Sequence, residues 1–141
     1  MADLSRFHKA QVGVIEAAIA ELAAGAKRGH WMWFVFPQLR GLGRSATARR
    51  YAIADLDEAR AYLADPVLGP RLIRAAEALL AHAGQPAQAI LGPVDAMKLR
   101  SSATLFREAG GGPVFQRLID SFFDGAPCRR TLTALGRGDD P

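Results

Sequence analysis

The most aromatic stretch of the chain is KRGHWMWFVFPQ, residues 27–38. It holds both tryptophans, two of the seven phenylalanines and one of the three histidines. Such a run would be poorly soluble on a surface, so most of it must be covered by the rest of the protein. Polar residues flank it, with Lys27, Arg28 and His30 on one side and Gln38 and Arg40 on the other. An apolar wall edged by donors is typical of a small-ligand pocket, and equally typical of a core segment with one wet end.

Length and composition indicate one globular domain. The chain has 141 residues, of which 50% are hydrophobic, enough to bury one proper core. No apolar run reaches the roughly 18 to 20 residues of a membrane span, and the N-terminus lacks a basic-then-apolar signal pattern. The single cysteine, Cys128, excludes an internal disulfide and gives no metal cluster. We therefore expect a cytoplasmic protein of a bacterium-like cell, without membrane association.

Positive charge is concentrated around the aromatic stretch. The net charge is +4, and no acidic residue occurs between Glu21 and Asp55. That interval contains six cationic residues, namely Lys27, Arg28, Arg40, Arg44, Arg49 and Arg50. A local field of this sign attracts anions. A solvated basic face near helix ends would give the same pattern, so both interpretations stay open.

Hydrophobic spacing predicts helices along most of the chain. In residues 3–24, Phe7, Val12, Ile15, Ile19 and Leu22 mark one apolar stripe of a single helix. Further helices are expected over 31–36, 46–53, 55–64, 66–83 and 93–108, from 113 onward, and over 129–135. We predict one all-α domain of seven or eight helices over residues 1–135, followed by a flexible tail over 136–141.

Capping residues mark several of these helix starts. Ser45 is a good N-cap, and Asp55 followed by Glu58 resembles a capping box. Asp65 precedes a proline, which suits the first position of a helix, and Pro93 and Pro113 each follow a glycine.

The helix over 93–108 carries a second polar group. Asp95, Lys98 and Ser102 share one of its faces, with Ser101 beside them. The neighbouring face, formed by Val94, Met97, Ser101 and Leu105, is expected to point inward. An ordinary ion pair on a helix surface explains Asp95 and Lys98 at a few tenths of a kcal/mol. Alternatively, the aspartate and the hydroxyls hold the lysine ready for a phosphate or a sugar oxygen.

Other chemical motifs are missing from the sequence. There is no glycine-rich phosphate loop ending in Lys-Ser or Lys-Thr, and no Gly-x-Ser-x-Gly elbow. His8, His30 and His82 lack the spacing of zinc ligands, so no metal site is predicted. No cofactor is implied either.

The chain resembles a known bacterial family of unknown function, the one numbered 1810. The segments that carry the resemblance are HWMWFVFPQ (30–38), GLGRS (41–45), YAI (51–53), EA (58–59), YL (62–63), LGPRL (68–72), SSATLF (101–106) and VF (114–115), together with Asp95 and Lys98. The match extends from about residue 4 to residue 135, and Ala103 stands where a methionine is expected. The resemblance implies a small helical domain without an established activity. The label "calpastatin", often given to such proteins, does not fit a chain with this much apolar core, because that inhibitor type is disordered.

The order of parts is also similar to a small helical superfamily that acts on ADP-ribose-type N-glycosidic compounds. There too an aromatic segment bearing a histidine precedes a helix with polar contacts. The acidic residue that would follow the tryptophan is not matched, because Met32 and Trp33 follow Trp31. This similarity implies only a class of ligand.

Three functional hypotheses follow. In the first, the protein binds, and in one version hydrolyses, an anionic nucleotide-like or ADP-ribose-like molecule. Trp31 or Trp33 would stack on it. Arg28 and Lys98 would hold phosphate, with Gln38, Ser101 and Ser102 as further polar contacts, and His30 or Asp95 would act as general acid or base.

The second hypothesis is a protein-interaction module anchored by the aromatic stretch. The third is weak binding of single-stranded nucleic acid, which is less favoured because the basic residues are too few for a long groove. The sequence does not indicate an oligomeric state.

Overall fold

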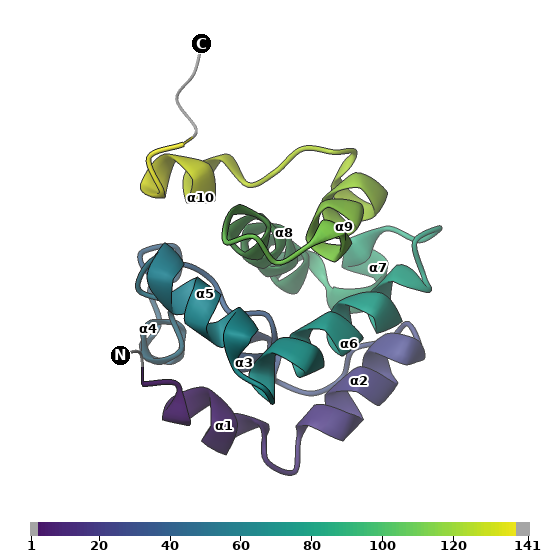
Figure 1. Ribbon diagram of the computed structural model, residues 1–141. Coiled ribbons are helices and arrows are strands. Elements are labelled where there is room, and N and C mark those ends of the chain that lie inside the picture. The colour runs from purple at the N-terminus through teal and green to yellow at the C-terminus, as the bar shows by residue number, and fades with distance from the viewer. Residues whose placement is uncertain (1–2, 138–141) are drawn as a thin grey trace.

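Ten helices are formed by residues 3–137, the part of the chain that this computed structural model describes (Figure 1). They are α1 (Ser5–Gln11), α2 (Ile15–Ala23), α3 (Met32–Val35), α4 (Ala46–Arg50), α5 (Leu56–Ala64), α6 (Leu68–Leu80), α7 (Ala87–Leu91), α8 (Pro93–Glu108), α9 (Pro113–Phe123) and α10 (Arg129–Ala134). The prediction of an all-α domain is confirmed. Residues 138–141 of the predicted tail lie outside the described residues. Within 3–137, no helix combines the length and apolarity that crossing a membrane requires.

The predicted single helix over 3–24 is wrong, because the chain turns at Gly13. This glycine has a φ of +74°, a conformation that residues with a side chain rarely adopt, and it separates α1 from α2. Val12, which we placed on the buried stripe, is 73% exposed as a result. Phe7, Ile15 and Leu22 are buried as expected.

Most other predicted helix starts are confirmed within a few residues. The Ser45 hydroxyl accepts a hydrogen bond from the backbone N–H of Ala48, and Asp55 caps α5 through the N–H of Glu58. Asp65 accepts from the N–H groups at the start of α6, which begins at Leu68 rather than at the preceding proline. The short helix α7 was not predicted, and α4 is shorter than expected.

The longest helix, α8, lies at the centre of the bundle (Figure 1). It contacts α5, α7, α9 and α10, and every residue from 101 to 106 is buried. Our assignment of its inner face was wrong at the N-terminal end. Val94 and Met97 are 66% and 72% exposed, whereas Leu99 and Ser102 are fully buried. The reason is that only the C-terminal half of α8 is enclosed on all sides, while one face of its N-terminal half stays open.

A row of aromatic rings links the outer helices to α8. Phe7 of α1 meets Tyr62 of α5 edge to face, with ring centroids 5.1 Å apart. Tyr62 contacts Phe106 of α8 at 5.4 Å, and Phe106 contacts Phe115 of α9 at 5.7 Å. The Tyr62 hydroxyl also shares the carbonyl of Phe34 with the amide of Gln11. This network fixes α3, and with it the aromatic stretch, against α1 and α5.

Candidate functional site

The carboxylate of Glu21, at the end of α2, shapes the segment that leads into the aromatic stretch. It accepts hydrogen bonds from the backbone N–H groups of Arg28 and Gly29, at 2.8 and 2.9 Å, and from the indole Nε1 of Trp31 at 2.9 Å. Burial opposes the ionisation of Glu21, but these hydrogen bonds outweigh it, so its pKa lies below the ordinary value. Trp31 is thereby held in the core, where it is 2% exposed.

Two lysines converge on Asp95, in the first turn of α8. Lys27 Nζ lies 2.8 Å from one carboxylate oxygen, and Lys98 Nζ lies 3.3 Å from the other. Lys27 also lies over the ring of Trp31, 5.1 Å from its centroid, and donates to the carbonyl of Gly29. Lys98 lies over the ring of Trp33, 4.3 Å from its centroid. Asp95 therefore connects the buried indole to the second, half-buried one.

The segment after α3 folds back on itself, so that residue 53 lies beside residue 39. Arg40 N–H donates to the Ile53 carbonyl at 2.7 Å, and Ile53 N–H donates to the Gln38 carbonyl at 2.8 Å, which makes an isolated bridge between residues 39 and 53. The intervening loop folds tightly on itself. A Cβ at Gly43 would lie only 2.5 Å from the Cβ of Ala48, so the position requires glycine. The bridge holds this loop opposite the exposed face of α8.

A pocket of about 410 Å³ lies between this loop and α8. One side is formed by Trp33 of α3 and, after that helix, by Gln38, Leu42, Gly43, Arg44, Ser45 and Ala48. The other side is formed by Val94, Met97, Lys98 and Ser101 of α8 and by Cys128 and Arg130, which lie at the start of α10. We call this cavity the Trp33 pocket.

The lining of the Trp33 pocket is apolar and cationic. It includes the cations Arg44, Lys98 and Arg130, and none of the described residues that line it is acidic. Arg44 and Arg130 are exposed and form no ion pair with an acidic group among residues 3–137. The Lys98 side chain is 17% exposed, so its ammonium group is largely shielded from solvent and is placed by Asp95 and Trp33. A shielded ammonium group over an aromatic ring, with two exposed guanidinium groups in the same lining, suits a ligand that carries negative charge.

The structure brings four of the nine predicted site residues to this pocket, namely Trp33, Gln38, Lys98 and Ser101. Asp95 does not line the pocket but contacts the ammonium group of Lys98, which does. The side chains of Arg28 and His30 are exposed and do not line it, while Trp31 and Ser102 are buried. The hydroxyl of Ser102 has no hydrogen-bond partner among the described residues, whereas Ser101 bonds to Thr131 of α10 at 3.0 Å.

Sequence reasoning missed the contributions of Arg130, Cys128, Met97 and Val94. Met97 and Val94 were assigned to the core, because periodicity alone does not show which part of α8 is left uncovered. Arg130 and Cys128 are distant in sequence from the aromatic stretch, and only the docking of α10 on α8 brings them close. Arg44 was noted as part of the acid-free interval but not as a site residue. No group of three or more metal-ligating side chains occurs within residues 3–137.

Comparison with known proteins agrees with the family suggested by the sequence. The sequence profile of DUF1810, described as a protein family of unknown function, matches residues 1–135. The chain therefore belongs to this family. Its fold matches the crystal structure of the conserved hypothetical protein Rv1873 from Mycobacterium tuberculosis with a TM-score of 0.93. The two share 47% sequence identity, and the alignment covers 95% of this chain and 96% of that one. No curated protein matches the chain.

Proposed function

We propose that this protein binds a small, phosphate-bearing, nucleotide-like molecule in the Trp33 pocket. The observation that carries the proposal is the pairing of the half-buried Trp33 ring with Lys98, in a pocket whose other charged residues are Arg44 and Arg130. A phosphate that contacts these cations brings the next part of the ligand against the indole. A volume of about 410 Å³ is within the range of small-molecule sites.

Each lining residue has a chemical role in this proposal. Arg44 and Arg130 approach from opposite sides of the pocket and supply forked donors, which suit phosphate oxygens. Gln38 and Ser45 offer neutral polar groups for a sugar or a base edge. Asp95 is a positioning residue, because it contacts the ammonium group of Lys98 and lies outside the lining.

The proposal concerns binding. Among the described residues that line the pocket there is no aspartate, glutamate or histidine to act as general base, and His30 and Asp95 do not line it. Hydrolysis of an ADP-ribose-like compound remains a version of the proposal that would need Asp95 to release Lys98. Turnover assays with such compounds address it separately from binding.

A thermal-shift panel tests the proposal. Adenosine 5′-monophosphate (AMP), ADP-ribose, NAD and inorganic phosphate are added to the wild type, to Lys98→Ala and to Arg117→Ala. Arg117 is an exposed arginine of α9 outside the pocket, so its removal is the matched control. A nucleotide present at 100 times its Kd should stabilise the wild type and the control by about 2.7 kcal/mol. Lys98→Ala should lose most of that gain. The proposal fails if no nucleotide stabilises the wild type.

A second candidate function, docking of a protein segment, is favoured by one observation. Val94 and Met97 are large apolar side chains with most of their surface exposed, and both lie on the rim of the pocket. Exposed apolar anchors of this kind occur at protein interfaces. This function would be selected instead if no nucleotide has an effect and the mass in solution increases with protein concentration. Met97→Asp should then abolish that increase.

A further inference from the structure

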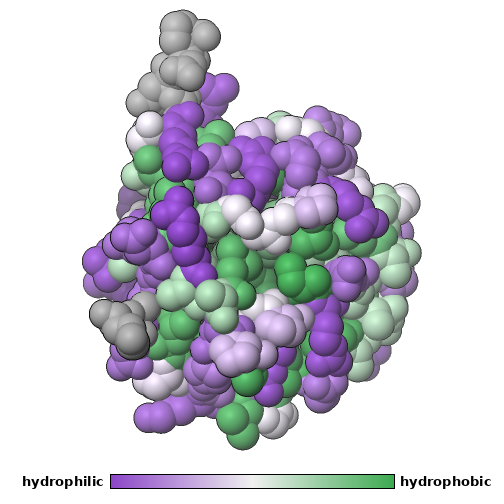
Figure 2. Space-filling model, viewed as in Figure 1, coloured by the Kyte–Doolittle hydropathy of each residue, from purple (hydrophilic) through white to green (hydrophobic). Residues whose placement is uncertain are grey.

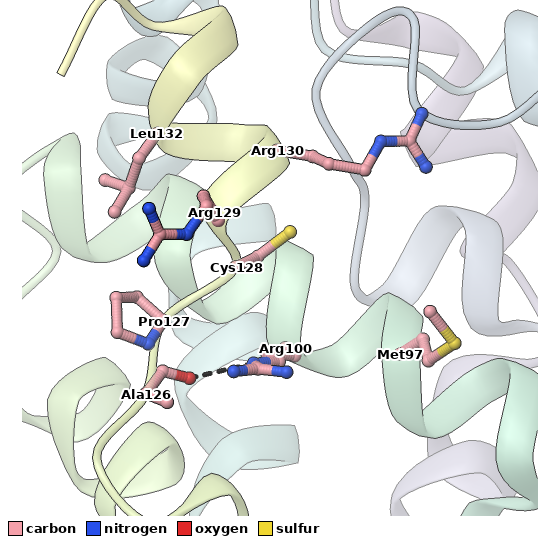
Figure 3. Close-up of a pocket in the computed structure, with 8 residues that line it drawn as sticks. All are labelled: Met97, Arg100, Ala126, Pro127, Cys128, Arg129, Arg130 and Leu132. Carbon is pink, nitrogen blue, oxygen red and sulfur yellow. Dashed lines mark hydrogen bonds between the residues drawn. The ribbon is translucent and has the colours of Figure 1, made fainter. Parts of the chain in front are cut away.

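The wall of the Trp33 pocket formed by Met97, Cys128 and Arg130 is shared with a second cavity of about 390 Å³ (Figure 3). We call it the Arg129 cavity. Its remaining lining comes from Arg100 of α8, from the 126–127 segment and from Arg129 and Leu132 of α10. The two cavities therefore follow one another along the exposed side of α8, with Cys128 between them.

Two further arginines supply charge to the Arg129 cavity. Arg100 donates from Nε to the carbonyl of Ala126 at 2.8 Å, which fixes its guanidinium and leaves the terminal nitrogens for another acceptor. Arg129 is exposed and has no ion-pair partner among residues 3–137. In Figure 3 the guanidinium group of Arg129 lies to the left of Cys128, that of Arg100 lies below it, and that of Arg130 extends to the upper right. None of the described residues that line this cavity is acidic.

The segment that carries Arg129 and Arg130 is attached to α8 at defined points. Backbone N–H of Cys128 donates to Thr104 Oγ1 at 2.9 Å, and Thr104 donates in turn to the carbonyl of Arg100 at 2.8 Å. Ser101 and Thr131 share the buried hydrogen bond described above. These contacts are made on the α8 side, so both arginine side chains are left free to face the cavities from a fixed backbone.

We infer that the Arg129 cavity is a second anion subsite for the same ligand. The ligand then carries two separated phosphate groups, one bound by Lys98, Arg44 and Arg130 and the other by Arg100 and Arg129, with the linking part lying over Cys128. This inference rests on the proposed function and narrows it to nucleotides with phosphates at two positions. Among the described lining residues, the two clusters of cations have no acidic residue between them. A ligand with one phosphate can contact only one of these clusters at a time.

The test compares a nucleotide with one phosphate and a nucleotide with two separated phosphates. AMP and adenosine 3′,5′-bisphosphate are titrated calorimetrically into the wild type, Arg129→Ala, Lys98→Ala and the control Arg117→Ala. Arg129 is exposed and its side chain forms no hydrogen bond or ion pair within residues 3–137, so its variant should fold. Loss of charge-assisted hydrogen bonds should weaken the bisphosphate about tenfold in Arg129→Ala and leave AMP unchanged. Lys98→Ala should weaken both nucleotides.

The outcomes separate the two proposals. If AMP binds and depends on Lys98, but Arg129→Ala binds the bisphosphate as tightly as the wild type, the second subsite is refuted and the proposed function stands. If neither nucleotide binds the wild type, both proposals fail. If a single-stranded oligonucleotide binds with a steep salt dependence and the bisphosphate does not, the two cavities serve a nucleic acid and the inference is again refuted.

Alkylation of the single cysteine gives an independent readout. Cys128 is partly exposed and lies in the wall that the two cavities share. Bisphosphate should slow its reaction with iodoacetamide in the wild type and in Arg117→Ala. It should protect Arg129→Ala only when its concentration is raised about tenfold, in line with the weaker binding. Equal protection of Arg129→Ala and the wild type at the same concentration would overturn the inference.

Discussion

Two tryptophan–lysine pairs lie side by side in this protein, and they differ in what surrounds them. Lys27 lies over Trp31 and Lys98 over Trp33, and one carboxylate, that of Asp95, contacts both ammonium groups. Trp31 is 2% exposed, and its indole N–H is bound by Glu21. Trp33 is half-buried and lines a pocket.

The difference shows that residue type alone does not identify a site. The first pair has its donors satisfied by Glu21, by a backbone carbonyl and by Asp95, so it serves to hold α2, the 27–31 segment and α8 together. The second pair is left open by the same architecture. On the side of α8 next to this pair, a pocket lies between α8, the 38–48 segment and the start of α10. Figure 2 shows hydrophobic residues gathered in the middle of the face viewed in Figure 1, with hydrophilic residues around them.

The largest expected difference between the pairs is in stability. Trp31→Ala removes a buried aromatic side chain and leaves a cavity, and should lower the free energy of unfolding by ~3 to 5 kcal/mol. Trp33→Ala should lower it by less, about 1 to 2 kcal/mol, because Trp33 is only partly buried and part of its surface already contacts solvent. Urea unfolding of both variants measures this. Equal losses would show that the two indoles are equivalent.

The next effect concerns the carboxylate that joins the pairs. Asp95→Ala leaves the ammonium of Lys27, whose side chain is 8% exposed, without its carboxylate, and should cost about 2 kcal/mol. Lys98→Ala keeps the contact between Lys27 and Asp95 and should cost about 1 kcal/mol or less. Unfolding free energies at neutral pH decide the order. A greater loss for Lys98→Ala would assign Lys98, and with it the pocket, to the structural core.

Two adjacent serines of α8 should affect stability in opposite directions. Ser102 is buried with an unpartnered hydroxyl among the described residues, so Ser102→Ala should raise the free energy of unfolding by about 1 kcal/mol. Ser101→Ala breaks the hydrogen bond to Thr131 and should lower it by about 1 kcal/mol. Thermal unfolding of the two variants gives the signs. Loss of stability in Ser102→Ala would reveal a partner, such as a buried water, for that hydroxyl.

The smallest effect is a pH dependence that arises at Glu21, the hydrogen-bond acceptor of the buried indole. The folded-state pKa of Glu21 lies below its ordinary value, because its hydrogen bonds outweigh the effect of burial. Its contribution to stability is therefore present above the unfolded-state pKa and is lost as the pH falls through the folded-state pKa. The stability difference between the wild type and Glu21→Gln should shrink between pH 6 and pH 3. A difference that stays constant over this range would show that Glu21 does not ionise with the expected linkage.

Much of the fold could be predicted from local signals. Ser45, Asp55 and Asp65 cap helices as expected, because capping depends on neighbours within three residues. The bounds of α8 followed from Gly92-Pro93 and from the length of the pattern. The break at Gly13 was missed, because an apolar stripe with one glycine is compatible with a continuous helix. The helix α7 was missed because five residues are too few to show a period.

The site could be predicted only in part. Trp33 and Lys98 could be predicted because aromatic residues and a cation on a predicted helix are recognisable from the sequence, without knowledge of their positions in space. Val94 and Met97 are exposed because no other element within residues 3–137 covers that part of α8. A local sequence pattern does not show which part of a helix is left uncovered. Arg130 enters the pocket only through the hydrogen bonds that dock the 126–131 segment on α8, and these join residues more than 20 positions apart.

Fluorescence of two variants, each with one tryptophan, distinguishes the indole of the pocket from the buried indole. Trp31→Phe retains only the indole of the pocket, and Trp33→Phe retains only the buried one. We expect acrylamide to quench the Trp31→Phe protein readily and the Trp33→Phe protein poorly. We also expect adenosine 3′,5′-bisphosphate to change the emission of the Trp31→Phe protein alone. Emission that responds to the nucleotide in Trp33→Phe but not in Trp31→Phe would contradict this expectation.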